Sequence, residues 1–205
     1  MNRNWYYIKQ GASGSIPPAT VSCAAGSVSF SGNQGLFLAS AITVGSGVGP
    51  VTASFEAQGV PDRIQIEYNG AIVADSLFVG DGLITSPNSY IPAILATTSF
   101  NVYNYNGSGF VYAGYSQSVS YTMADIADTG SVYNRSGNYG TGGGNGPGQI
   151  GVIGSYPYPI SNCADGTIKV GFYKSTQYPA IVNIIVTGGP SGTAWSLVSL
   201  TCPSS

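Results

Sequence analysis

The 205-residue sequence contains no histidine and few charged residues. Asp, Glu, Lys and Arg together make up 7% of the chain, against about 25% in an average soluble domain. The absence of histidine excludes Ser-His-Asp and Cys-His catalytic arrangements and every metal site that needs an imidazole ligand. A surface so poor in charge must be solvated by hydroxyl and amide groups. Because it has little ionic repulsion, we expect it to self-associate readily.

Basic residues are also scarce: six Lys and Arg lie scattered along the chain, and the net charge is −2. No basic patch is present to release counterions from phosphates, so we do not expect nucleic-acid binding. No apolar run approaches the length of about 18 residues that a membrane span needs, so no membrane partner is expected. The N-terminus, MNRNWYYIKQ, lacks the apolar stretch of a secretory signal, which predicts synthesis in a host cytoplasm.

Cysteine is present at only three positions, Cys23, Cys163 and Cys202. An odd count cannot form a disulfide framework by itself, and without histidine or a CxxC pair we expect no zinc site. Two interpretations stay open: three buried apolar thiols, or one disulfide with one thiol left over. Cys163–Cys202 is the first pair to consider, because both residues flank the last β block. Synthesis in a reducing cytosol would favour free thiols.

The strongest local pattern is VPDRIQIEYNGAIVADSLFVGD, residues 60–81. Two alternating apolar runs are joined by Asn69-Gly70, a pair typical of a type I′ hairpin turn because both central positions need positive φ. The alternation places one set of side chains on each face of the first strand: Ile64, Ile66 and Tyr68 on one, and Arg63, Gln65 and Glu67 on the other. The adjacent Asp62-Arg63 pair is interpreted as a local ion pair or turn.

The whole chain shows about ten short strands with turn signals every 8–12 residues, which predicts an all-β, antiparallel sandwich or jelly-roll-like fold. The glycine-rich break at residues 45–50 predicts an N-terminal β-rich arm, residues 1–50, followed by a sandwich domain, residues 51–205. Residues 83–96 contain two prolines and are expected to form an edge or loop. In the last strand, Leu200 is expected on the face opposite Trp195. Residues 134–148 predict a long glycine-rich loop, either disordered or ordered against a subunit or ligand.

Aspartates near the hairpin suggest a cation site. Asp62, Asp75 and Asp81 lie at strand ends, where backbone carbonyls can add the oxygen ligands that calcium needs, so a structural calcium is one hypothesis. The alternative is ordinary turn chemistry, in which each carboxylate bonds nearby backbone, since no D-x-D-x-D loop is present. No other cofactor is expected. Without a phosphate-binding loop or a signalled pair of carboxylates, we expect no enzyme activity.

Tyrosine is abundant at 15 residues, and two uses are open. The rings can stack on the apolar faces of sugars, or they can form subunit contacts, where tyrosine is enriched. The candidate binding residues for a subunit or a glycan are Tyr103, Tyr105, Tyr112, Tyr133 and Tyr139.

Two segments carry a family resemblance. VPDRIQIEYNG with VADSLFVGD near the start of residues 51–202, and GTIKVGFYKSTQYPAIVNIIVTGGPSGTAWSLVSLTCP at the end, resemble a β-sandwich module of small virion proteins from tailed bacteriophages; the opening WYYIKQ is similar to these proteins too. The resemblance implies a non-enzymatic virion protein that acts as a capsid cement or decoration protein, or alternatively a tail-fibre or baseplate protein that recognises a carbohydrate receptor. It implies location in the virion. The expected partners are further copies of the chain, as a trimer, and other virion proteins such as the major capsid protein.

Overall fold

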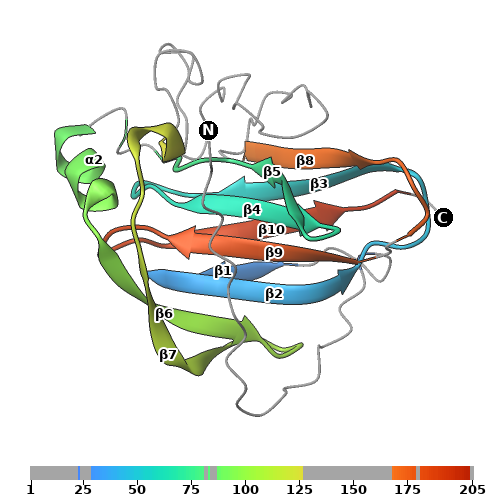
Figure 1. The fold of residues 1–205 in the computed structure, drawn as a ribbon, viewed down its shortest axis with the longest axis horizontal. Coiled ribbons are helices and arrows are strands. Elements are labelled where there is room, and N and C mark those ends of the chain that lie inside the picture. The colour runs from blue at the N-terminus through green and yellow to red at the C-terminus, as the bar shows by residue number, and fades with distance from the viewer. Residues whose placement is uncertain are drawn as a thin grey trace.

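The computed structural model describes Cys23, Leu83 and residues 29–80, 87–126, 168–178 and 181–203. Within these ranges the chain forms two facing sheets (Figure 1). The smaller sheet has the order β1 (Phe30–Gly32), β10 (Trp195–Thr201), β3 (Gly49–Glu56), β8 (Ile168–Lys174). The larger sheet has the order β5 (Ala71–Asp75), β4 (Arg63–Tyr68), β9 (Ile181–Gly188), β2 (Gly35–Thr43), β6 (Thr98–Tyr105), β7 (Phe110–Val119). The predicted all-β sandwich is confirmed, and the jelly-roll connectivity stays a prediction.

A single apolar core lies between the two sheets. The alternating inward residues of β3 and β8 are buried, as their sequence pattern predicts, and the bulkiest of the core side chains is Trp195 on β10. β9 lies in the middle of the larger sheet, between β4 and β2, which explains its nearly continuous apolar sequence. Pairing is antiparallel throughout the named strands except between β2 and β6, which run parallel.

The predicted hairpin is β4–β5. Asn69 and Gly70 have φ values of 53° and 75°, the two positive angles that a type I′ turn requires. Ile64 and Ile66 are fully buried in the core, and Tyr68 packs beside Phe172 with ring centroids 5.0 Å apart. The predicted division of the strand into an apolar inner face and a polar outer face is therefore confirmed.

The break at residues 45–50 does not separate two units in the described part of the chain. β2, which precedes it, pairs with β9 along most of its length, and β1 pairs with β10. Residues 30–50 therefore belong to the same two sheets as the segment that follows. A glycine-rich stretch marks a turn between strands as readily as a boundary between domains, and here it connects the two sheets.

Residues 87–95 were expected to be an edge or loop, and they form α2 instead (Pro87–Leu95). Pro87 is the first residue of the helix, where its missing N–H removes no helical hydrogen bond. Pro92 lies inside the helix, which is only nine residues long. The helix persists because Ile94 packs into a small apolar cluster with Phe78, so burial outweighs the lost bond.

β10 corrects a second expectation. Leu200 was placed on the face opposite Trp195, yet both side chains are buried in the core. The register between β10 and β3 shifts between Leu197 and Ser199. A bulge adds one residue to the strand and so reverses its alternation, which returns Leu200 to the inner face.

The disulfide joins Cys23 to Cys202, with their Cα atoms 6.1 Å apart. This corrects both the pairing of Cys163 with Cys202 and the expectation of free thiols. Cys163 lies outside the described residues, as does the whole of the predicted glycine-rich loop, residues 134–148. The bond closes a loop of 179 residues and ties the chain that precedes β1 to the end of β10.

Candidate functional site

A buried ion-pair network covers the outer face of the larger sheet at the start of β4. The guanidinium of Arg63 donates from Nε to Asp75 Oδ1 at 2.8 Å, from Nη2 to Asp75 Oδ2 at 2.5 Å, and from Nη1 to Asp125 Oδ1 at 2.9 Å. The side-chain amide of Gln65 and the backbone N–H of Leu77 also donate to Asp75, each at 2.8 Å. Both oxygens of Asp75 are therefore occupied by protein donors.

Asp125 belongs to η2 (Met123–Asp125), a short 3₁₀ turn that follows β7 in the chain. Its Oδ2 accepts from the backbone N–H and hydroxyl of Thr122, and its backbone carbonyl accepts from the N–H of Phe78. The ring of Tyr121 lies 5.7 Å from the Arg63 guanidinium and makes an edge contact with the ring of Phe78. Arg63 therefore fastens the segment around η2 to the hairpin.

Burial and charge oppose each other in this network. Burial alone would lower the pKa of Arg63, but hydrogen bonds and charge from Asp75, with the charge of Asp125, raise it above its ordinary value. Burial also acts to raise the pKa of Asp125, yet the bonds from Thr122 and the charge of Arg63 lower it overall. Arg63 and Asp125 therefore both favour their ionised forms near neutral pH, as an ion pair requires.

The expected local pair of Asp62 with Arg63 is wrong. Neighbouring residues in an extended strand point to opposite faces, so Arg63 turns outward and Asp62 turns away from it. Asp62 is fully buried, and its Oδ1 accepts from the N–H of Gly189 at 2.7 Å and the hydroxyl of Thr193 at 2.6 Å. This carboxylate holds the turn between β9 and β10.

The other oxygen of Asp62, Oδ2, is buried and has no hydrogen-bond partner among the described residues. Burial raises the pKa of this carboxyl well above its ordinary value, against the bonds from Thr193 and Gly189 that lower it. The protonated acid is the form that this environment favours. An ionised carboxylate here would cost free energy, because a buried, unpaired polar atom is destabilising by about 1–3 kcal/mol.

We therefore predict that Asp62 makes the fold less stable as pH rises. Near the ordinary aspartate pKa of about 4 and below it, both folded and unfolded chains carry the proton. Above that pH the unfolded chain ionises first, so the stability contributed by protonated Asp62 declines until the pH passes the raised pKa of the folded state. Chemical denaturation at several pH values should show this decline in the wild type and not in Asp62→Asn. Equal pH profiles for the two proteins would contradict the assignment.

In the described part of the chain, the aspartates proposed for calcium do not form a shared site. Asp75 is bound by Arg63, Asp62 supports a turn, and Asp81 lies outside the described residues. Within the described ranges no three His, Cys, Asp or Glu side chains form a group suited to a metal ion. A calcium site that includes Asp81 stays a prediction.

Three of the five candidate binding tyrosines, Tyr103, Tyr105 and Tyr112, lie on the β6–β7 hairpin. Tyr133 and Tyr139 lie outside the described residues. Tyr103 is half-buried and stacks on Phe37, with centroids 4.8 Å apart and planes at 11°. Tyr105 is half-buried against Phe30, 4.6 Å between centroids. Of these three candidates, Tyr112 is the most exposed, with 50% of its surface accessible to a partner.

β7 forms the outer edge of the larger sheet and pairs only with β6 among the described strands. None of its ten residues is charged, and Val111, Tyr112 and Tyr115 are exposed. Its register against β6 shifts between Asn101 and Tyr103, opposite Gly114, which has a φ of 85°. The strand is therefore bent at its middle. Figure 1 shows the hairpin at the end of the sheet opposite β5.

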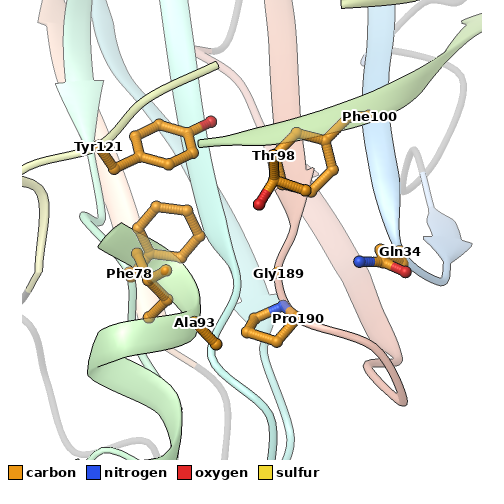
Figure 2. A pocket seen from close by; sticks show the side chains of 9 residues that line it. Gln34, Phe78, Ala93, Thr98, Phe100, Tyr121, Gly189 and Pro190 are labelled. Carbon is orange, nitrogen blue, oxygen red and sulfur yellow. The ribbon is translucent and has the colours of Figure 1, made fainter. Parts of the chain in front are cut away.

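A small hollow lies between α2, β6 and the β9–β10 turn (Figure 2). The rings of Phe78 and Tyr121 border one side, and Gln34 and Pro190 border the other. Its volume is about 20 Å³, room for about one water molecule. The hollow is thus too small for an organic ligand.

Sequence reasoning missed the partner of Arg63 on η2, which lies 62 residues away along the chain. The one available signal was the arginine itself, which begins a β strand in a chain that has only six Lys and Arg. No family model matches the chain, and no curated protein or solved structure matches it either. In the described part of the chain, no helix has the length and apolar character to cross a membrane.

Proposed function

We propose that this chain is a non-enzymatic structural protein that assembles with further copies of itself and stabilises a larger particle. The observation that carries the proposal is β7, a ten-residue edge strand without a charged side chain. Proteins that remain monomeric protect such edges with charged residues, proline or a covering segment. Here the exposed residues include Val111, Tyr112 and Tyr115, residue types that suit a contact between subunits.

The occupant that fits this edge is a second copy of β7. Two uncharged strands can pair through their main chains in antiparallel fashion about a two-fold axis, with no like charges brought together. This contact joins two copies, so the trimer expected above would need a second contact. The bend at Gly114 divides the strand into two shorter segments. Such a bend limits pairing to a matching partner and favours a closed assembly over an open stack of sheets.

The resemblance to phage virion proteins indicates that the larger particle is a phage virion. Under this proposal the chain is a capsid cement or decoration protein located in the virion, with the major capsid protein as its other partner. The disulfide between Cys23 and Cys202 supports an oxidising final environment. Surfaces of released particles provide one, whereas a host cytosol does not.

Charging the β7 edge should abolish self-association. The variant Val111→Lys/Ser118→Lys places a cation in each half of the strand, at two exposed positions. Bringing like charges together costs several kcal/mol, so we expect the association constant to fall by about a hundredfold or more. Size-exclusion chromatography with light scattering measures the change in mass.

The matched control is Val48→Lys, which makes the same substitution at an exposed position between β2 and β3. It should leave the oligomer unchanged. A wild-type protein that is monomeric at all concentrations and does not bind capsids lacking it would refute the proposed function. An oligomer that withstands both β7 lysines would place the contact elsewhere.

A further inference from the structure

A shallow groove of about 430 Å³ lies at the tip of the β4–β5 hairpin, beside the start of β9. Its lining combines one carboxylate, two primary amides and an aliphatic side chain with backbone of the turn: Glu67, Asn69, Gly70, Ile181, Val182 and Asn183. It lies at the hairpin tip on β4 and β9, two strands of the larger sheet that are separated from β7 by β2 and β6. No contact proposed above for assembly involves it.

Asn183 is held in place by an irregularity of the neighbouring strand. The register between β2 and β9 shifts between Ala39 and Ile42, and Ala41 has a φ of 56°, a left-handed angle that is unfavourable for alanine. The backbone N–H of Ala41 donates to Oδ1 of Asn183 at 2.9 Å. This bond fixes the amide, so that its Nδ2 faces the adjacent strand. Strained bulges of this kind often orient a side chain at a binding site.

Glu67 lies directly opposite Asn183 in the β4–β9 ladder. Nδ2 of Asn183 is 3.5 Å from Oε1 of Glu67, the outer limit for a hydrogen bond. The amide and the carboxylate thus lie side by side, and the weak hydrogen bond between them leaves both groups able to bond to a ligand. A group that both donates and accepts hydrogen bonds can occupy them together, and Ile181, which is 46% exposed, adds an apolar wall.

We propose that this groove binds a saccharide through adjacent hydroxyl groups. One hydroxyl donates to the Glu67 carboxylate and accepts from the Asn183 amide, and Asn69 supplies a further amide at the rim. The lining contains no Lys or Arg to attract an anionic ligand, and its single carboxylate is a poor cage for a metal ion. The volume suits one or two sugar rings.

The test uses the full-length chain, titrated separately with glucose, galactose, mannose and N-acetylglucosamine, and followed by amide chemical shifts. The same chain is applied to an array of oligosaccharides. We expect at least one sugar to shift the amides of Gly70, Ile181 and Asn183. Glu67→Gln keeps the shape and removes the charge, so it should weaken binding about tenfold.

Asn69→Gly removes the rim amide at a position where positive φ is required, so the turn is retained and binding should also weaken. Glu56→Gln is the matched control, because Glu56 lies on β3 in the other sheet, and it should bind as the wild type does. Absence of any response on both the array and the titration would overturn the proposal. The proposal would also be overturned if calcium alone changed the chemical shifts of the groove amides. Sugar binding that Glu67→Gln leaves unchanged would overturn it as well. None of these outcomes depends on self-association.

Discussion

Replacing Arg63 with methionine is expected to lower the free energy of unfolding by about 3–5 kcal/mol, the usual cost of removing one partner from a buried ion pair. The substitution leaves Asp75, which is only 2% exposed, as a buried carboxylate without its counter-ion. It also releases η2, because Asp125 loses the same partner. Guanidinium denaturation followed by the fluorescence of the buried Trp195 provides the measurement.

Two companion variants keep this prediction testable even if Arg63→Met does not fold. Arg63→Lys retains the charge but lacks the planar fork that reaches both oxygens of Asp75, so an intermediate loss is expected. Arg63→Met/Asp75→Asn removes both charges and should recover part of the stability. If Arg63→Met costs less than about 1 kcal/mol, the value typical of an exposed pair, the network is not a structural centre of the fold.

Replacing Cys202 with serine is expected to cost about 5 kcal/mol, because the disulfide closes a loop of 179 residues and restricts the unfolded chain. Cys23→Ser should cost the same, and the double variant should cost no more than either single one. A reducing agent should lower the stability of the wild type to that of the variants. It should have no further effect on the variants themselves.

Cys163→Ser is the control for this pairing. It should leave the stability nearly unchanged, because the bond joins the other two cysteines. A large loss on replacing Cys163, with none on replacing Cys23, would instead support the pairing of Cys163 with Cys202.

Local patterns in the sequence predict the strands well. The β4–β5 hairpin follows from Asn69-Gly70, because few residue pairs accept two positive φ angles. The same two-residue alternation is seen on β6, with Val102 buried on one side and Tyr103 packed on the other. These features depend on neighbours in sequence and on the two-residue period of a strand.

The errors share a different cause, which is dependence on distant residues. Leu200 is buried because a bulge forms against β3, and α2 is stable because it packs on Phe78. The partners of Arg63 and Cys202 lie 62 and 179 residues away. No local pattern specifies such a distance, so these contacts could not be predicted from the sequence. The same limit applies to the groove, where Glu67 and Asn183 meet only in the folded sheet.

The central claim, that β7 pairs with a second copy of itself, is tested most directly by amide hydrogen exchange measured at increasing protein concentration. If β7 edges pair, the amides of residues 110–119 should exchange more slowly once the oligomer forms, while those at the tip of the β4–β5 hairpin should not change. Val111→Lys/Ser118→Lys should lose this protection. An oligomer in which β7 exchanges as rapidly as in the monomer would contradict the account.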